Sequence, residues 1–339
     1  MKKTNIGIVG LGRLGKSYAE NIAFKIRNAE LLAACSLVKE ELEWAKKEVG
    51  VENCYESYEE MLKLDLLDAI FVVSSTNMHA EHMIKALEAG FHVFSEKPLA
   101  ISIEDCLKVE TVAAKYPHQK AVVGFVRRFD KSYRYAWEKV KSGAIGEVFM
   151  VRSQTVDKDT LAGFQLEYAG SSGGLFHDYN VHDVDLARWY LQDNVSEIWS
   201  LGGAYKYPGF ADIGDADNVS STCRFEKGGM AIIHASRTAM HGHDTYTEIT
   251  GTEGSLRIGR PAGINRVEIY DQYGARKECV ETFWDRFEEA FLLMAQDFID
   301  CLQEGREPEL KISDATEATR TTTAMTHSFH SKQLEIIIR

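Results

Sequence analysis

The fold of this chain is decided near its start, by Ile6-Gly7-Ile8-Val9-Gly10-Leu11-Gly12-Arg13-Leu14-Gly15. The apolar run of residues 6–9 predicts a buried strand, and the apolar spacing of residues 16–23 predicts a helix. Three glycines spaced GxGxxG between a strand and a helix are typical of a dinucleotide-binding turn. The first permits the tight turn, the second lets backbone amides approach a pyrophosphate, and the third lets helix and strand pack closely. The alternative is a structural turn whose glycines serve packing alone.

Composition and charge narrow the classes of partner. The chain has 339 residues, enough for two domains, and its 45% hydrophobic and 27% charged residues are typical of a soluble globular protein. Acidic residues outnumber basic ones by 51 to 39, so we expect neither nucleic acid nor a membrane surface as a partner. The first residues lack the apolar core of a secretory signal, and no apolar run is long enough to span a membrane. We therefore expect a cytoplasmic protein.

Six cysteines are scattered along the chain without a CxxC pair. This usage favours unpaired, mostly buried thiols in a reducing cytoplasm. It also lacks the ligand spacing of a zinc site, and we expect no metal. The cysteines are Cys35, Cys54, Cys106, Cys223, Cys279 and Cys301.

Strands and helices alternate over the first 124 residues. Near-continuous apolar runs at 30–36, 69–74, 91–95 and 120–124 predict further strands, with helical patterns between them. About six strands alternating with helices predict an α/β fold with a doubly wound parallel sheet. The pattern changes after residue 124, and we place the end of a dinucleotide-binding Rossmann domain, 1–124, at that point.

Residues 125–339 form the second predicted domain. Short strands with glycine turns dominate residues 147–274 and predict an antiparallel sheet. Amphipathic patterns at 284–302 and 313–330 predict two long helices that complete this α/β domain.

The end of the second strand bears on the choice between NAD and NADP. An acid is usual there, about twenty residues past the glycines, where it binds the ribose hydroxyls. Ser36 holds that place in this chain. A carboxylate would repel the 2′-phosphate of NADP, whereas a serine would not. Lys39 follows closely enough to meet a phosphate, or else is a solvated residue of the next helix. Both cofactors therefore remain open.

Charged residues follow the strand 91–95, at the edge where ligands bind in open α/β sheets. Glu96 and Lys97 stand there, and Pro98 fixes the backbone after them and is a candidate for a cis peptide bond. We interpret the pair as functional rather than as an exposed salt pair. His79, after the strand 69–74, is a further candidate for a place near the cofactor, or else a residue of a surface helix.

The densest group of chemically active side chains lies within residues 173–189. A glycine pair precedes a predicted helix on which Asp178 and His182, four residues apart, share a face. A carboxylate beside an imidazole raises its basicity and fixes its tautomer, as a general base requires. The alternative is a buried histidine satisfied by a neighbouring aspartate.

Taken together, these motifs resemble the glucose–fructose oxidoreductase / inositol dehydrogenase family, and most closely its inositol 2-dehydrogenase branch. The motifs follow one another in the family's order over nearly the whole chain. They are the GLGRLG turn, Ser75-Thr76-Asn77-Met78-His79, Glu96-Lys97-Pro98-Leu99-Ala100, Gly124-Phe125-Val126-Arg127-Arg128-Phe129-Asp130, Asp178 with His182, Ile249-Thr250-Gly251-Thr252-Glu253-Gly254, and Trp284 before the last long helices.

The resemblance implies a fold, an assembly and a reaction. The fold is a Rossmann domain followed by an α/β domain with an open, mostly antiparallel sheet, through which members associate as dimers or tetramers. The reaction is the oxidation of a secondary hydroxyl of a cyclic polyol, most closely myo- or scyllo-inositol, to a ketone by NAD or NADP.

The resemblance also implies roles for single residues. Lys97 would hold the reacting oxygen and help relay its proton, and His182 would act as the acid/base. Asp178 would bind a neighbouring hydroxyl and orient His182, while Arg127 would shape the polyol site. Substrate contacts would come from Lys97, Arg127, Asp157, Asp178, His182 and His243. Cofactor contacts would come from Gly10, Gly12, Arg13, Leu14, Gly15, Ser36, Ser75, Asn77, His79, Glu96 and Lys97.

Other functions stay open at this point. A different sugar or polyol dehydrogenase, or an NADPH-dependent ketone reductase, would use the same motifs. A catalytically silent dinucleotide sensor would keep the glycine turn and lose the pocket residues, so Lys97, Asp178 and His182 together favour an enzyme. We expect the choice of polyol to depend on residues 155–170 and 239–244, which we interpret as loops.

Overall fold

The computed structural model describes residues 3–259, 263–265 and 267–339. They form two compact units, which are residues 1–126 with 289–319 and residues 127–288 with 320–339. No helix within the described ranges is both long enough and apolar enough to cross a membrane. The first division lies two residues beyond the predicted one at 124, and the first unit also takes up residues 289–319, which the sequence prediction places in the second domain.

The first unit holds a six-stranded sheet in the order β3-β2-β1-β4-β5-β6, with every adjacent pair parallel. This order confirms the predicted doubly wound sheet. Strand β3 is not among the strands located from the sequence, because three residues are too few for a periodic pattern. The strands are β1 (Thr4–Val9), β2 (Ala29–Cys35), β3 (Asn53–Tyr55), β4 (Ala69–Val72), β5 (His92–Glu96) and β6 (Ala121–Gly124). The helices between them are α1 (Arg13–Phe24), α2 (Lys39–Glu48), α3 (Tyr58–Met61), η1 (Thr76–Met78), α4 (His79–Glu88) and α5 (Ile103–Ala113).

Aromatic packing explains why residues 289–319 belong to the first unit. Helix α10 (Phe283–Glu304) contributes Phe291 and Phe298, whose rings contact Tyr18 of α1 and Phe71 of β4. Phe71 is stacked on Phe94 of β5, with ring centroids 4.6 Å apart. Buried aromatic pairs of this kind add to the stabilisation from burial alone. The apolar stripe of α10 therefore covers the Rossmann sheet, which its amphipathic pattern alone could not reveal.

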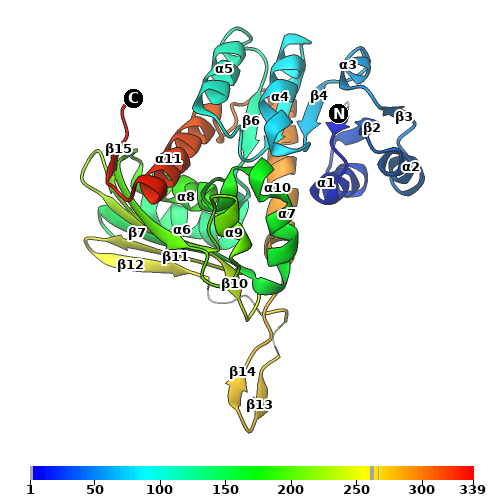
Figure 1. Ribbon diagram of the computed structural model, residues 1–339. Coiled ribbons are helices and arrows are strands. Elements are labelled where there is room, and N and C mark those ends of the chain that lie inside the picture. Colours follow the sequence, from blue (N-terminus) through cyan, green and yellow to red (C-terminus); the bar gives the residue numbers. More distant parts are fainter. Residues whose placement is uncertain (1–2, 260–262, 266) are drawn as a thin grey trace. The chain divides into compact units, whose positions relative to one another are not determined.

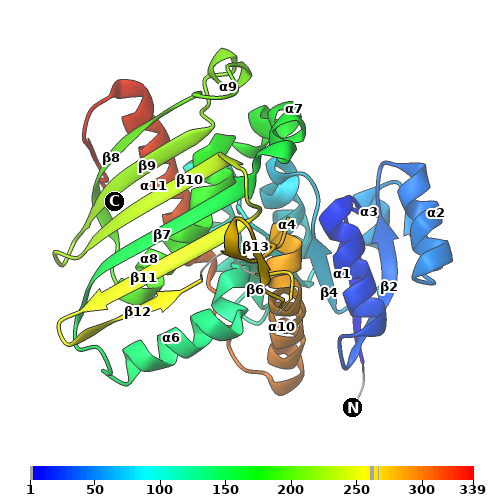
Figure 2. The same ribbon diagram turned by 90° about the horizontal axis from the view of Figure 1, so that it is seen from below.

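The second unit holds a seven-stranded sheet in the order β12-β11-β7-β10-β9-β8-β15. Its β7–β10 pair is parallel and the other described pairs are antiparallel, which confirms a mostly antiparallel sheet. Figure 2 shows these strands side by side with helices α6 and α8 on one face. The strands are β7 (Val148–Lys158), β8 (Val195–Gly203), β9 (Asn218–Phe225), β10 (Met230–Ala239), β11 (Asp244–Gly251), β12 (Gly254–Ile258) and β15 (Glu335–Ile336).

Several shorter elements complete the second unit. A hairpin of β13 (Ile269–Asp271) and β14 (Gly274–Arg276) extends from it, as Figure 1 shows. The helices are η2 (Val126–Phe129), α6 (Lys131–Lys141), η3 (Asp159–Leu161), α7 (Ala162–Ser172), α8 (Val181–Leu191) and α9 (Gly209–Asp212), and α11 (Ile312–Ser331) is shared between the units.

The interpretation of residues 155–170 as a loop was wrong. Strand β7 continues to Lys158, and α7 occupies Ala162–Ser172. Ala162, Leu166 and Ala169 lie on one side of α7 and pack with Phe210. Glycines within this segment obscured the helical pattern, since glycine disfavours a helix interior. The interpretation of residues 239–244 was closer, because β10 ends at Ala239 and β11 begins at Asp244.

Alternation along β7 sorts its side chains between the two faces of the sheet. Ser153, Thr155 and Asp157 are buried at every second position on the face that α8 covers. Three polar residues at consecutive inward positions are unusual for a core strand, because buried polar groups need hydrogen-bond partners. These three residues therefore mark the part of the second sheet where polar side chains, rather than apolar ones, face the core.

Candidate active site

The three glycines after β1 serve different purposes. A Cβ on Gly10, where φ is +92°, would lie 2.5 Å from the Val73 carbonyl oxygen, and a Cβ on Gly15 would lie 2.1 Å from the carbonyl oxygen of Gly10. A Cβ on Gly12 would meet nothing within 4 Å. The fold itself therefore requires the first and third glycines, whereas the second borders open space that a ligand can enter.

The N-terminus of α1 suits an anion. Its N-cap, Gly12, supplies no side-chain hydrogen bond, and the first turn contains no acidic residue. The first N–H groups of a helix lack partners within the helix and carry partial positive charge. Open space at Gly12 beside these donors fits the pyrophosphate of a dinucleotide.

Gly12→Val separates ligand binding from folding. We expect NAD affinity to fall by about tenfold or more, because the new side chain occupies the space that the pyrophosphate would take. The melting temperature should stay near that of the wild type, since the Cβ meets no atom of the chain. Gly10→Val is the matched control, and it should lower the melting temperature because its Cβ collides with backbone. Unchanged NAD affinity in Gly12→Val, measured by calorimetry, would contradict this use of the turn.

An acidic side chain lies at the end of β2, supplied from the following helix. The Ser36 hydroxyl donates a hydrogen bond to Oε2 of Glu41 at 2.5 Å and accepts one from the Val38 backbone N–H at 3.1 Å. Glu41 stands in the first turn of α2. Ser36 thus holds a carboxylate where a dinucleotide fold usually has its own acid. Lys39 instead pairs with Glu56 at 3.7 Å on the surface.

His79 connects the loops that follow β4 and β5. Its Nδ1 lies 2.8 Å from the Pro98 carbonyl oxygen, and its Nε2 lies 2.9 Å from the Ser74 carbonyl oxygen. The ring is 2% exposed, and burial lowers the pKa of His79. Both ring nitrogens therefore face backbone carbonyl oxygens of the chain, so His79 contacts both loops, and its predicted place near the cofactor stays a prediction. Ser75 and Asn77 expose their side chains in the intervening turn, and their cofactor contacts stay a prediction.

Glu96 is engaged inside the first unit rather than exposed at its edge. The Tyr18 hydroxyl donates a 2.5 Å hydrogen bond to its Oε1, and the Lys97 backbone N–H donates one to its Oε2 at 3.1 Å. Burial raises the pKa of Glu96. Glu96 thus fixes the backbone of Lys97, whose side chain is half-buried just past the end of β5. The Lys97–Pro98 peptide bond is cis, as the sequence suggested.

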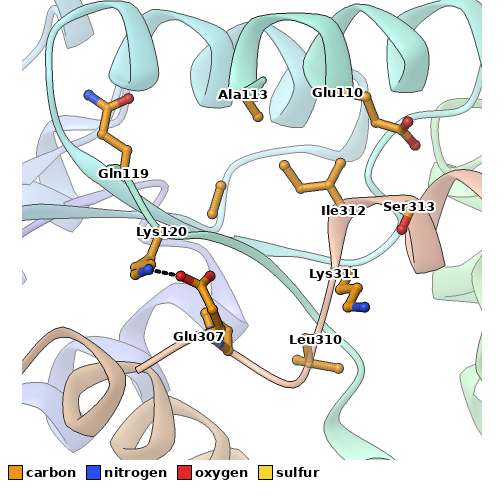
Figure 3. Close-up of a pocket in the computed structure, with 11 residues that line it drawn as sticks. Glu110, Ala113, Gln119, Lys120, Glu307, Leu310, Lys311, Ile312 and Ser313 are labelled. Atoms are coloured by element: carbon orange, nitrogen blue, oxygen red, sulfur yellow. Dashed lines mark hydrogen bonds and ion pairs between the residues drawn. The ribbon is translucent and has the colours of Figure 1, made fainter. Parts of the chain in front are cut away.

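A cavity of about 520 Å³ lies elsewhere in the first unit, as Figure 3 shows. Lys120 and Ala121, at the start of β6, line it together with the segment 307–313, and Lys120 pairs with Glu307 across it. In a parallel sheet the starts and the ends of the strands lie at opposite edges. The glycine turn and Lys97 follow strand ends, where ligands of open α/β sheets bind, so this cavity is not part of the dinucleotide site.

A glycine pair opens the candidate catalytic segment of the second unit. Gly173 and Gly174 have φ of +83° and +78°, and a Cβ on Gly173 would lie 2.9 Å from Cβ of His177. A π-helical turn, Phe176–Asn180, follows and leads into α8. The predicted helix is therefore present, with a first turn of a kind that is frequent at functional sites.

Asp178 and His182 are half-buried within this helical segment, whose neighbouring positions are mostly buried. The Tyr168 hydroxyl of α7 donates a 3.3 Å hydrogen bond to Oδ2 of Asp178. Partial exposure leaves both side chains able to meet a ligand, unlike His177, which is buried against Thr322 and whose pKa burial lowers to about 4. The structure therefore leaves the predicted acid–base pair, Asp178 and His182, partly accessible, and their catalytic role stays a prediction.

Two buried ion pairs fix α8 in the second unit. Arg127 donates to Oδ1 of Asp183 at 2.9 Å and to the Thr155 hydroxyl at 2.6 Å. Arg128 donates to both carboxylate oxygens of Asp185, at 2.9 and 2.5 Å. Bidentate pairs of this kind fix geometry as well as charge. Arg127 is 3% exposed and links α8 to β7, and its predicted part in the polyol site stays a prediction. Its partner Asp183 was not among the predicted site residues.

Asp157 and His243, the remaining predicted substrate residues, are brought together. Oδ1 of Asp157 lies 2.6 Å from Nδ1 of His243. Tyr179 and Gln165 bind the other carboxylate oxygen, at 2.5 and 3.0 Å. Neither Tyr179 nor Gln165 was among the predicted site residues, although the polar inward positions of β7 indicate a buried network.

A Rossmann sheet with an open glycine turn, and a second sheet domain bearing a half-buried aspartate and histidine, define the class of dinucleotide-dependent oxidoreductases. Comparison with known families agrees: residues 4–125 match "Oxidoreductase family, NAD-binding Rossmann fold", and residues 133–257 match "GFO/IDH/MocA C-terminal domain". The chain belongs to the GFO/IDH/MocA oxidoreductase family, which confirms the resemblance inferred from its motifs.

Individual relatives carry related names. A scyllo-inositol 2-dehydrogenase (NAD(+)) from Bacillus subtilis (strain 168) is 33% identical, over 96% of this chain and 93% of its own length. A myo-inositol 2-dehydrogenase from Thermotoga maritima is 31% identical over 91% of each chain. The crystal structure of scyllo-inositol dehydrogenase from Lactobacillus casei with bound NAD(H) and scyllo-inositol is 38% identical over 99% of each chain, with a TM-score of 0.96.

Proposed function

We propose that this protein is an NAD-dependent dehydrogenase that oxidises one secondary hydroxyl of an inositol, myo- or scyllo-inositol, to the corresponding inosose. The observation that carries the proposal lies in the second unit. The half-buried Asp178 and His182 share a helical segment with Tyr179, which belongs to the buried network of Asp157. A cluster so rich in hydrogen-bonding groups suits a ring with many hydroxyls. The relatives named as inositol dehydrogenases support the same substrate class.

The proposed cofactor-binding and catalytic residues come from both units. The glycine turn of the first unit would hold NAD, which supplies the acceptor for the hydride that leaves the carbinol carbon. His182 takes the hydroxyl proton as the C–H bond breaks, and Lys97 holds the reacting oxygen as it becomes a carbonyl. Asp178 accepts a hydrogen bond from a neighbouring hydroxyl and orients His182. The products are the ketone, NADH and one proton.

A rate assay tests the proposal. Purified protein is mixed with NAD, and then with NADP, and with myo-inositol, scyllo-inositol, glucose or xylose, and the absorbance of reduced nicotinamide is followed. Turnover on an inositol supports the proposal, while faster turnover on glucose or xylose would assign a sugar dehydrogenase instead. Tight NAD binding without turnover on any of them would overturn the inositol assignment and favour first another polyol or a ketone substrate, and then a silent sensor.

We propose NAD rather than NADP as the preferred cofactor. The carboxylate of Glu41, held on Ser36, stands where it would repel a 2′-phosphate and could bind the ribose hydroxyls. Glu41→Gln should raise kcat/KM for NADP relative to NAD by about threefold to tenfold, because one unit of negative charge is removed near the surface. Glu43→Gln, an exposed position of the same helix, is the control. An unchanged cofactor ratio in Glu41→Gln would remove Glu41 from cofactor selection.

We propose that copies of the chain associate through the open face of the second sheet, as a dimer or tetramer. Four large apolar side chains, Trp199, Leu201, Met230 and Ile232, are between 39% and 53% exposed there. Trp199 and Ile232 are both register partners of Thr222, so they lie in one row across the sheet. An apolar patch of this kind on a soluble protein marks an interaction surface.

Ile232→Glu should therefore reduce the particle mass in sedimentation velocity, because a buried charge would face the partner's apolar surface. Leu107→Glu, an exposed position of α5, should leave the mass unchanged. Equal masses for wild type and Ile232→Glu would contradict association through this face.

We propose a cytoplasmic location. All six cysteines are free thiols in the structure, and four of them are buried, which suits a reducing compartment.

A further inference from the structure

We propose that Arg237 and Asp215 are positioning residues for the reaction, because their buried ion pair fixes the helical turn that carries Asp178. They act on the backbone and on an aromatic ring of this turn rather than on the substrate. The inference rests on the proposed function and adds to its site two residues that were not predicted from the sequence.

Asp215 caps the start of the turn from a distant part of the second unit. Leu175, the N-cap of the π-helical turn Phe176–Asn180, is apolar, and the first backbone N–H groups of a helical segment lack partners within it. Oδ1 of Asp215, in the loop between α9 and β9, accepts a hydrogen bond from the Leu175 N–H at 3.0 Å. A Cβ on Gly174 would lie 3.0 Å from the same oxygen. The glycine therefore leaves room for a carboxylate that caps the turn from 40 residues away.

Arg237 of β10 holds the other oxygen of this carboxylate. Its Nη1 donates to Oδ2 of Asp215 at 2.7 Å and to the Ala216 carbonyl oxygen at 2.9 Å. The Arg237 side chain is fully buried, and its guanidinium lies over the ring of Phe210, 4.5 Å from the ring centroid. Burial alone would lower the pKa of Arg237, but the Asp215 carboxylate outweighs burial and raises that pKa, so the group is a cation. The carboxylate is thus held between a fixed positive charge and a backbone N–H.

The same cation contacts the far end of the turn. It lies 5.6 Å from the centroid of the Tyr179 ring, and Tyr179 directly follows Asp178. The Asp178 carboxylate also contributes to the raised pKa of Arg237, so these two charges attract each other. The ion pair therefore acts on the turn on both sides of Asp178, at Leu175 and at Tyr179. A shift of this turn would displace Asp178 from the hydroxyl that it is proposed to bind.

Folding stability alone does not account for this arginine. Nε and Nη2 of Arg237 are buried and have no hydrogen-bond partner among the residues that the structure describes. A buried cation with unpaired donors is costly, and well-packed apolar side chains in place of a buried ion pair are often as stable or more stable. Such costly arrangements are expected mainly at functional sites, which favours a positioning role for the pair.

The double variant Arg237→Met/Asp215→Leu separates positioning from stability, because it removes both charges and leaves apolar side chains of similar length. On the inositol that the wild type oxidises, we expect kcat to fall by about tenfold to a hundredfold, the effect of misplacing a reacting group by about 1 Å. NAD affinity should stay within about threefold. The melting temperature should exceed that of either single variant, since each of those leaves an unpaired buried charge. Values of kcat are taken per NAD-binding site counted by calorimetry, so that unfolded protein does not enter them.

Single variants give readouts that a merely structural pair would not produce. The losses of kcat in Arg237→Met and Asp215→Leu should not multiply in the double variant, because the two residues act as a unit. Arg237→Lys should restore kcat to within about fivefold of the wild type, since Arg237 bonds Asp215 through Nη1 alone and one ammonium can replace that bond.

Asp215→Asn serves as the test if the double variant does not fold. The amide has one acceptor oxygen, which can serve the Leu175 N–H or Arg237 but not both. We expect kcat to fall by about tenfold, and wild-type kcat in this variant would overturn the inference.

Asp130→Leu is the matched control for Asp215→Leu. Asp130 pairs with Arg286 at 2.7 Å and caps α6 by accepting from the Ser132 and Tyr133 N–H groups, at 3.0 and 3.2 Å. The arrangement is the same, an arginine behind an aspartate that caps a helical segment, but α6 carries none of the proposed catalytic residues. Asp130→Leu should lower the melting temperature and keep kcat within about threefold of the wild type.

The outcomes also separate the inference from the proposed function. Wild-type kcat in the folded double variant, with turnover of an inositol by the wild type, would overturn the positioning role and leave the function standing. An equal loss of kcat in Asp130→Leu and Asp215→Leu would overturn it as well, because any lost cap would then have that effect. Absence of wild-type turnover on any inositol would overturn the function, and with it the positioning role. A lowered kcat at a recovered melting temperature, restored by Arg237→Lys, would support both.

Discussion

Lys97→Met is expected to lower kcat for inositol oxidation by about a hundredfold to ten-thousandfold, the range typical of losing a group that assists proton transfer. Methionine keeps the length of the lysine stem and removes only the ammonium, which is proposed to hold the reacting oxygen. The backbone should stay in place, because the Lys97 N–H is bonded to the buried Glu96 carboxyl. NAD affinity, measured by calorimetry, should therefore change by no more than about threefold.

The control for this variant is another lysine of the first unit. Lys108 lies on α5, where it is exposed and pairs with Asp105 at 2.7 Å. Lys108→Met should keep wild-type kcat. Lys97→Arg is informative as well, since it keeps the charge in a bulkier, planar group, and we expect a loss smaller than that of Lys97→Met. Wild-type turnover in Lys97→Met would remove Lys97 from the mechanism.

Much of the first unit could be predicted from the sequence, because its structure follows from short-range sequence patterns. The tight turn at Gly10 and the open space at Gly12 follow from the spacing of three glycines after an apolar strand. The same holds for Lys97, which the end of β5 places at the ligand-binding edge. Short-range patterns suffice where one strand, one turn and one helix make the site.

The sequence did not predict the environment of a side chain whose hydrogen-bond partner belongs to another element. Ser36 stands where the dinucleotide-binding pattern usually has an acid, but its hydroxyl binds the carboxylate of Glu41 in the following helix. His79 was predicted to lie near the cofactor, yet its two ring nitrogens face the carbonyl oxygens of Ser74 and Pro98. Hydrogen-bond partners depend on side-chain direction, which a sequence pattern does not contain.

Long-range strand pairing explains why the network of Asp157 could be predicted only in part. Val156 on β7 is the register partner of Asp244 on β11, and this pairing sets Asp157 beside His243, 86 residues away in sequence. The resemblance to the family supplied both residues as candidates, but no sequence pattern supplied the register. Gln165 was missed for a related reason, because α7 was not recognised as a helix and its inward side could not be assigned.

His182→Ala is expected to lower kcat by about a hundredfold to ten-thousandfold as well, while NAD affinity stays within about threefold of the wild type. The imidazole is the proposed base, so without it the hydroxyl proton has no acceptor of suitable strength as the hydride departs. Single-turnover rates with pre-bound NAD should fall in parallel with kcat, which places the loss in the chemical step rather than in product release.

Two further variants decide how the loss of kcat in His182→Ala is interpreted. His330→Gln, an exposed histidine of α11 in the same unit, should keep wild-type kcat. Asp178→Asn should give an intermediate loss with a raised KM, because the amide can still bond a hydroxyl but no longer orients a cationic imidazole. If Asp178→Asn lowered kcat by about a hundredfold or more while His182→Ala retained most of its turnover, the base would be Asp178. Wild-type turnover in both His182→Ala and Lys97→Met would contradict the dehydrogenase mechanism itself, since no proton acceptor would then be needed from either unit.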